Sequence, residues 1–285
     1  MERPLTFDPA VVACSTITLR HLPLDRALAQ ISEQGFTSID LGALPGVCDH
    51  VPVPLDDDAV RSVADTVAAS GLTVVSVNAD VGDLNRPLSA DEAVARRAHL
   101  DRLIALCRAV GGAALVLPNG RQDHEPFVSH EADTALVAAE LEAIRAVVAE
   151  AGLRLWVEAP HLFRLHNSIA RSAPLIAQLD ERIGLVCDTS HIVASGGTVE
   201  EFARHYGPRI AHVHIRDAEP GFIHHSVGNG VVDFAASIAA LHAVGYRGAY
   251  SLELETRDVA DDDRARVARE TAEYISAIHS SKGTA

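Results

Sequence analysis

The chain has 285 residues, of which 48% are hydrophobic, so it can bury a large core and suits one α/β barrel of about 250 residues. Its 39 acidic residues against 24 Lys and Arg leave a formal charge of −15, which argues against nucleic-acid or anionic-lipid partners, because both require clustered cations. The sequence shows no signal-peptide pattern, no apolar run of membrane-spanning length and no CxxC spacing among the four cysteines. These features predict a cytoplasmic protein, and the acidic charge fits one that acts on a small molecule.

Apolar, β-branched runs alternate with Ala-rich amphipathic stretches along the whole chain. Strands are predicted at 11–15, 38–41, 73–78, 113–118, 154–158, 184–188, 211–216 and 249–253. Helices are predicted at 23–34, 56–69, 90–110, 134–151, 173–179, 198–205, 232–243 and 261–279. Eight strands, each followed by a helix and without a domain-scale linker, predict that residues 1–285 form one parallel (β/α)8 TIM barrel.

Acidic and imidazole side chains gather at the carboxyl ends of the later strands. In 211–216, His212, His214 and Arg216 share one face, and Val213 and Ile215 share the other. The apolar face suits the helix layer, so the polar side chains are expected to point into the barrel. Barrel active sites form at the carboxyl ends of the strands, where the same pattern places four ligand-type residues: Glu158, Asp188, His214 and Glu253.

An inward carboxylate without a partner is expensive to desolvate, so these acids require a compensating cation. Three carboxylates and one neutral imidazole form a hard ligand set that suits Mn²⁺, Mg²⁺, Co²⁺ or Zn²⁺. The alternative is that each acid pairs with an Arg or Lys near the rim. Convergence of four such residues from successive strands favours a single divalent metal ion.

Five segments carry a resemblance to a known family: Val157-Glu158-Ala-Pro-His161, Val186-Cys-Asp188-Thr-Ser-His191, His212-Val-His214-Ile-Arg-Asp217, Gly228-Asn-Gly230-Val-Val-Asp233-Phe and Gly245-Tyr-Arg-Gly-Ala-Tyr-Ser-Leu-Glu253. Their order resembles the D-xylose isomerase-like barrel superfamily, the sugar phosphate isomerase/epimerase family that includes D-tagatose 3-epimerase, hydroxypyruvate isomerase and inosose dehydratase. The resemblance extends over residues 11–253. It implies a xylose isomerase-like TIM barrel.

The resemblance also implies roles for individual residues. One divalent metal, with Mn²⁺ as the first expectation and Mg²⁺, Co²⁺ or Zn²⁺ as alternatives, would be bound by Glu158, Asp188, His214 and Glu253. Glu158 and Glu253 would also act as catalytic base and acid.

Three further residues are implied to bind substrate: His191, Arg216 and His161. For Arg216, a salt bridge to Asp217 or Asp188 is the alternative interpretation. For His161, the alternative interpretation is that it lies at the rim and has no role in binding.

The activity implied is a metal-dependent isomerase or epimerase of a ketose or related hydroxy-ketone sugar, which removes a proton beside a carbonyl and forms an enediolate. The alternative is a metal-dependent lyase on the same barrel: an inosose- or dehydroshikimate-type dehydratase, or an enzyme that cleaves an oxidised glycoside by elimination. A sugar or cyclitol is the expected substrate in either case, and the resemblance is compatible with a homodimer. A third hypothesis is a barrel that binds a ligand without catalysis. The acidic charge disfavours the activity of the DNA-cleaving relatives of this barrel.

Several other residues have expectations of their own. His212 is expected to support the metal site or the core, and Trp156 to plug the barrel. Glu255 is expected to be solvated or salt-bridged. At the rim, His50, Asn78 and His124 could each reach substrate. His224 and His225 are expected in an exposed loop, with contact to the pocket as the alternative, and the role of Asp40 at the end of the second strand is open.

Overall fold

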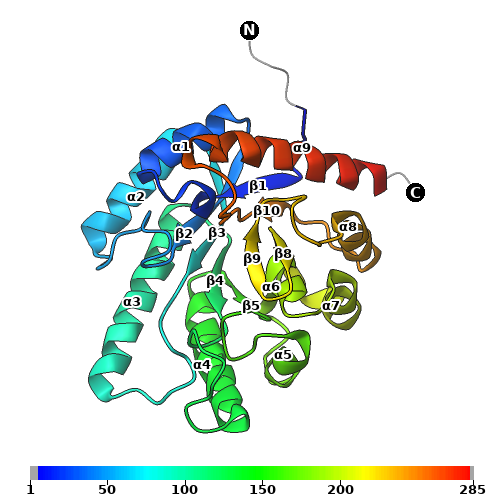
Figure 1. Ribbon diagram of the computed structural model, residues 1–285. Coiled ribbons are helices and arrows are strands. Elements are labelled where there is room, and N and C mark those ends of the chain that lie inside the picture. The colour runs from blue at the N-terminus through cyan, green and yellow to red at the C-terminus, as the bar shows by residue number, and fades with distance from the viewer. Residues whose placement is uncertain (1–5, 283–285) are drawn as a thin grey trace.

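The computed structural model describes residues 6–282 and contains a closed barrel of parallel strands ringed by helices (Figure 1). Around the barrel the strands follow the order β1 (Val12–Ser15), β10 (Tyr250–Leu252), β7 (Ile210–Ile215), β6 (Gly184–Asp188), β5 (Arg154–Glu158), β4 (Ala114–Pro118), β3 (Thr73–Ala79) and β2 (Ser38–Ala43). Strand β1 pairs with both β10 and β2, which closes the sheet. The predicted (β/α)8 TIM barrel is confirmed.

The helices, except the short α6 at the carboxyl end of the barrel, form its outer layer (Figure 1). They are α1 (Leu24–Glu33), α2 (Asp57–Ser70), α3 (Ala90–Ala109), α4 (His130–Glu150), α5 (Ile169–Ile176), α6 (Thr189–Ala194), α7 (Val199–Tyr206), α8 (Phe234–Ala243) and α9 (Arg264–Lys282), with short 3₁₀ turns η1 (Thr16–Leu19), η2 (Gly207–Arg209) and η3 (Asp261–Asp263). Side-chain caps define several helix starts. Ser89, for example, accepts the N–H of Glu92, whose carboxylate accepts the N–H of Ser89 in return. Within residues 6–282, none of these helices combines the length and apolar character needed to cross a membrane.

The structure corrects the sequence prediction at several helix boundaries. Helix α4 begins at residue 130 rather than 134, because Ser129 caps it, and α5 begins at residue 169 rather than 173, because Ser168 caps it. Neither α6, directly after β6, nor the hairpin of β8 (Asp217–Glu219) and β9 (Phe222–His225), directly after β7, was predicted. These short elements pack against each other at the carboxyl end of the barrel.

Two layers of apolar side chains hold the barrel together. The large cluster lies between strands and helices and includes Val213 and Ile215, as their alternation predicted. A small cluster fills the barrel interior and consists of Ala114, Val116, Trp156 and Val186. Trp156 is 4% exposed and stacks on His212 with 5.1 Å between ring centroids, so it plugs the amino-terminal half of the barrel as predicted. The carboxyl-terminal half is left to polar side chains.

Candidate metal centre

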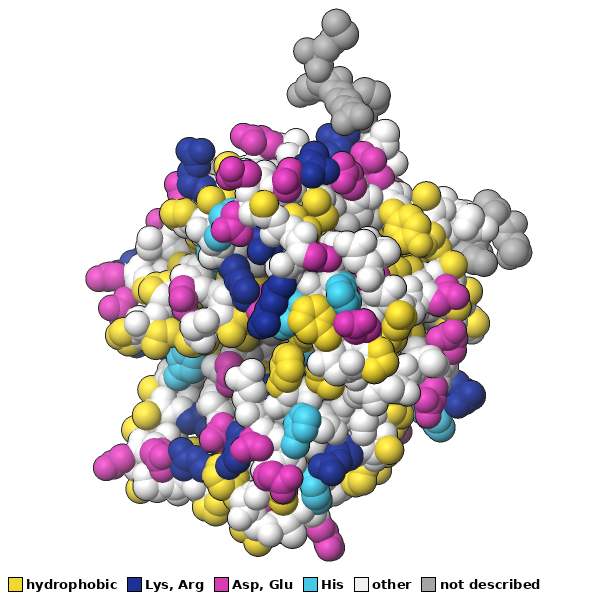
Figure 2. Space-filling view, in the orientation of Figure 1, with side chains coloured by type: hydrophobic (Ala, Val, Ile, Leu, Met, Phe, Trp, Pro, Cys, Tyr) yellow, Lys and Arg dark blue, Asp and Glu magenta, His cyan; other side chains and the backbone are white. Residues whose placement is uncertain are grey.

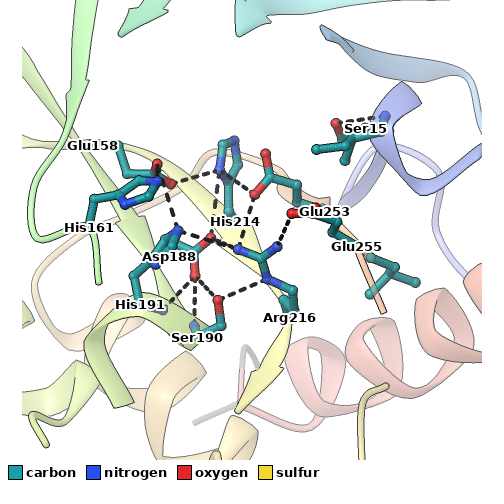
Figure 3. Close-up of polar contacts among 12 residues, drawn as sticks. Ser15, Glu158, His161, Asp188, Ser190, His191, His214, Arg216, Glu253 and Glu255 are labelled. Atoms are coloured by element: carbon teal, nitrogen blue, oxygen red, sulfur yellow. Dashed lines mark hydrogen bonds and ion pairs between the residues drawn. The ribbon is translucent and has the colours of Figure 1, made fainter. Parts of the chain in front are cut away.

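The four ligand-type residues converge inside the barrel mouth (Figure 3). One ligand atom from each of Glu158, Asp188, His214 and Glu253 lies within 4.8 Å of the others. His214 Nδ1 is 3.4 Å from Glu158 Oε1, 3.6 Å from Glu253 Oε2 and 4.0 Å from Asp188 Oδ2. All four residues are buried. The structure therefore brings together the residues that the strand-end pattern singled out.

Local structure orients each carboxylate toward this point. Asp188 ends β6 and caps α6: its Oδ1 accepts the backbone N–H groups of Ser190 (2.7 Å) and His191 (3.0 Å), which leaves Oδ2 facing His214. Glu253 follows β10, and its Oε1 accepts a 3.0 Å hydrogen bond from Asn78 Nδ2 of β3. Its other oxygen, Oε2, faces His214.

Negative charge at the centre exceeds what the protein neutralises. Arg216 Nη2 lies 3.5 Å from Asp188 Oδ2 and 3.6 Å from Glu253 Oε2, so its guanidinium pairs with two of the three buried carboxylates and not with Glu158. On the side of the centre, Glu158 Oε1 and His214 Nδ1 are buried without a hydrogen-bond partner. Unpaired buried polar atoms are costly, and three oxygens with one imidazole nitrogen suit a hard divalent cation. The residues present fit such an ion.

The pKa values of the centre reflect the same crowding. Burial raises the pKa of Glu253 to about 8, with the carboxylates of Glu158 and Asp188 adding to the effect. Burial acts to lower the pKa of His214, but the surrounding carboxylates, Glu253 first, hold it well above its ordinary value. A bound cation would replace these protons as the balancing charge.

Two stacked histidines, His161 and His191, cover Glu158, with 3.9 Å between their ring centroids. The N–H of Leu162 donates to His191 Nδ1 (3.1 Å), and the N–H of Phe163 donates to His161 Nδ1 (3.3 Å). Burial lowers the pKa of both imidazoles well below the ordinary value, so both are neutral. Because Nδ1 of His161 accepts, His161 carries its proton on Nε2, whereas Nε2 of His191 lies 3.4 Å from the donor Nη2 of Arg216. These two Nε2 atoms lie 3.7 Å and 4.0 Å from Glu158 Oε2. The pair thus places the Nε2–H of His161 beside the carboxylate, and His191 lies between this carboxylate and Arg216.

Arg216 is held by protein atoms on every side. Its Nε donates to Ser190 Oγ (2.9 Å), Nη1 donates to Glu255 Oε2 (3.1 Å), and Nη2 faces Asp188. Of the two salt bridges considered for it, the one to Asp188 is present. Glu255 is salt-bridged, as predicted, to Arg20 as well as to Arg216.

Asp217, the other partner considered for Arg216, instead holds a loop. Its carboxylate accepts the backbone N–H groups of Gly228 (2.8 Å), Gly230 (3.0 Å) and Val232 (3.1 Å). A Cβ at Gly230 would lie 2.3 Å from Asp217 Oδ1, so this close approach requires glycine. The Gly-Asn-Gly segment is therefore architectural.

A cavity of about 570 Å³ opens over the centre, a size typical of small-molecule sites. Figure 2 shows basic, histidine and apolar side chains together near the middle of this face. The lining includes the sequence-predicted Glu158, His161, His191, Arg216 and Glu253. The rest of the lining includes the apolar residues Ile17, Leu44, Pro45, Val47, Phe163 and Ile223. It also includes polar residues: Asn78, Asp80, Gln122, Arg164, His224, Glu255 and Arg257.

Not every rim residue behaves as expected. His224, expected in an exposed loop, is 5% exposed and lines the cavity, because the β8–β9 hairpin packs it against Phe163 at 6.3 Å between ring centroids. His50 instead makes a hydrogen bond to the carbonyl of Leu22, and His124 makes one to the carbonyl of Leu162; neither is among the residues that line this cavity.

Sequence reasoning considered Asn78 only as a rim residue that could reach substrate, and not as the residue that orients Glu253. It gave no role to Ser190, which links Asp188 to Arg216. A signal for Asn78 existed: it shares the inward face of β3 with Ser76 and lies near that strand's carboxyl end. A signal for Ser190 was the Asp-Thr-Ser-His run, which is typical of a capped helix start.

A sequence profile for the xylose isomerase-like TIM barrel matches residues 28–278. The chain belongs to this family. Within it, the chain is 31% identical over 256 residues to an L-ribulose 3-epimerase of Mesorhizobium japonicum, a match that covers 85% of this chain and 79% of the relative. A shorter match, 30% identical over 105 residues, relates it to an inosose isomerase of Bacillus velezensis and covers 33% of this chain and 38% of that protein.

Solved structures of the family share the fold. An L-ribulose 3-epimerase superposes with a TM-score of 0.75 at 24% identity and covers 96% of each chain. The protein IolI, solved with a zinc atom, gives a TM-score of 0.76 at 17% identity over 96% of this chain and 100% of its own. D-psicose 3-epimerase, solved in the presence of D-fructose, gives 0.75 at 14% identity over 94% of this chain and 99% of its own.

Proposed function

We propose that the protein is a divalent-metal-dependent isomerase or epimerase of a ketose or related hydroxy-ketone sugar. The observation that carries the proposal is the pair of buried carboxylates, Glu158 and Glu253, on either side of His214 at the floor of the cavity (Figure 3). Two carboxylates that flank one binding point can remove a proton from a carbon and return one from another direction.

The comparisons support this class of reaction. The relative with the longer sequence match is a ketose 3-epimerase, and the shorter match is to an inosose isomerase. IolI, with its bound zinc atom, supports a metal in this barrel, and the ligand set of three oxygens and one nitrogen also suits Mn²⁺. We expect Glu158, Asp188, His214 and Glu253 to hold the ion, which when bound polarises a carbonyl oxygen and stabilises developing negative charge.

Individual side chains carry out proton transfer and substrate binding. Glu158 accepts the proton from the carbon beside the carbonyl, and Glu253 returns a proton on the other side. His191 and His161 make hydrogen bonds to substrate oxygens, since both rings line the cavity. Arg216 keeps Asp188 and Glu253 in place and offers its charge to a substrate hydroxyl.

The test is proton exchange in D₂O. Purified protein loaded with Mn²⁺, and separately with Zn²⁺, is incubated with a panel of ketoses that includes L-ribulose, D-psicose and D-fructose. Deuterium at the carbon beside the carbonyl, together with an isomeric sugar detected by NMR, supports the proposal. Loss of water or of an aglycone would favour the lyase alternative, and no exchange with either metal would contradict both.

A matched pair of variants assigns the exchange to the site. Glu158→Gln should abolish deuterium incorporation, because an amide cannot accept the proton. Glu200→Gln makes the same chemical change at an exposed position in the first turn of α7 and should exchange at the wild-type rate. Equal exchange by both variants would rule out Glu158 as the base.

A further inference from the structure

A further buried acid, Asp40, lies behind the candidate metal centre. Asp40, from β2, is 0% exposed and accepts a hydrogen bond from His212 Nε2 (2.8 Å) on Oδ2 and from Ser76 Oγ (2.8 Å) on Oδ1. His214 Nε2 lies 3.5 Å from the same Oδ2. The imidazole of His214 therefore lies between two groups of carboxylates, with Nδ1 facing Glu158 and Glu253 and Nε2 facing Asp40.

The position of the single imidazole proton follows from this arrangement. A neutral imidazole has one N–H and one lone pair. If the Nδ1 lone pair points to a cation held with Glu158 and Glu253, the proton must reside on Nε2, where Asp40 is the nearby acceptor. A carboxylate behind a metal-binding histidine fixes its tautomer and ring orientation and strengthens its lone pair as a donor.

We propose that Asp40 is a positioning residue that holds His214 in the Nε2–H tautomer and thereby sets the affinity of the centre for its metal. The inference rests on the metal site of the proposed function. It assigns a role to a residue that is not among those that line the cavity.

The neighbours of Asp40 keep its carboxylate in place. Ser76 holds one oxygen, and His212, stacked on Trp156 and edge-on to His214 at 4.9 Å between centroids, holds the other. Every member of this network is at most 4% exposed, so water does not compete for Oδ2. Asp40 therefore cannot turn away from His214 without breaking two hydrogen bonds.

The first test measures Mn²⁺ affinity without any substrate. Asp40→Asn keeps the shape of the side chain and removes its charge; titration of the metal-free protein with Mn²⁺, followed by the EPR signal of free Mn²⁺, should show a Kd raised about 10- to 100-fold. The matched control is Asp133→Asn, a buried carboxylate that holds Asn85 and the loop before α4, away from the centre. It should bind Mn²⁺ with the wild-type Kd. A Kd for Asp40→Asn within twofold of wild type would overturn the proposal.

The second test uses the wild-type protein. In the ¹⁵N-labelled, Zn²⁺-loaded enzyme, the imidazole signals that disappear in His214→Gln should show a protonated Nε2 and an unprotonated Nδ1. Protonation at Nδ1 would overturn the proposal. If Asp40→Asn does not fold, this spectrum of the wild-type protein tests the proposal without the variant. Failure of the wild type to bind Mn²⁺ or Zn²⁺ would overturn it together with the metal site, whereas metal binding without sugar turnover would count against the proposed function only.

Discussion

His166 makes the barrel sensitive to acid. It is 1% exposed; its Nδ1 donates to the carbonyl of Asn119 (3.1 Å), so its Nε2 accepts from the hydroxyl of Thr134 (2.9 Å). Burial lowers the pKa of this imidazole to about 4. Its own carbonyl accepts the backbone N–H of His161, so His166 also anchors the loop that covers Glu158.

The size of the loss in unfolding free energy follows from the pKa values of His166 in the folded and unfolded states. An unfolded histidine has a pKa near 6.5. Between about pH 6.5 and about pH 4, His166 is therefore protonated in the unfolded chain and neutral in the folded protein. The stability contributed by neutral His166 is complete above pH 6.5 and is lost as the pH falls toward 4. At about pH 5 the loss amounts to about 2 kcal/mol, and near pH 4 to about 3 kcal/mol.

The assay is urea unfolding of metal-free protein in EDTA at about pH 7.5 and about pH 5, for wild type and His166→Gln. Glutamine offers one donor and one acceptor at this position but does not titrate. The variant should lose about 2 kcal/mol less unfolding free energy than wild type between the two pH values, because all other titrating groups are common to both. An equal loss in both proteins would refute the reasoning.

Three further predictions concern the centre and the barrel interior. Asp188→Asn and His214→Ala each remove a metal-ligand atom and should leave little Mn²⁺ after dialysis; unchanged metal by elemental analysis would contradict the site. Glu158→Gln keeps a ligand oxygen and should retain some metal while turnover falls about 100-fold or more, and full activity would exclude the base role. Trp156→Ala empties the barrel interior and should cost about 3–5 kcal/mol of unfolding free energy in urea; an unchanged value would show that the plug is dispensable.

Much of the barrel could be predicted from local pattern. All eight predicted strands are present, because alternation of apolar and polar residues reports the two faces of a strand directly. The errors in the predicted elements occur where a capping residue sets a helix start or where an element is very short. Ser168 starts α5 four residues earlier than expected, and α6 and the β8–β9 hairpin are too short to show a hydrophobic period. A cytoplasmic location, a homodimer and a single domain over residues 1–285 stay predictions.

The sequence by itself determined the kinds of side chain at the centre and their places at strand ends, because both follow from residue type and local periodicity. Only the tertiary structure decided which atoms face one another. Asn78 meets Glu253 across 175 residues of chain, and Asp40 meets His212 across 172, through closure of the barrel. Local pattern carries no information about such pairs, since a contact between distant strands depends on the register and closure of the whole sheet.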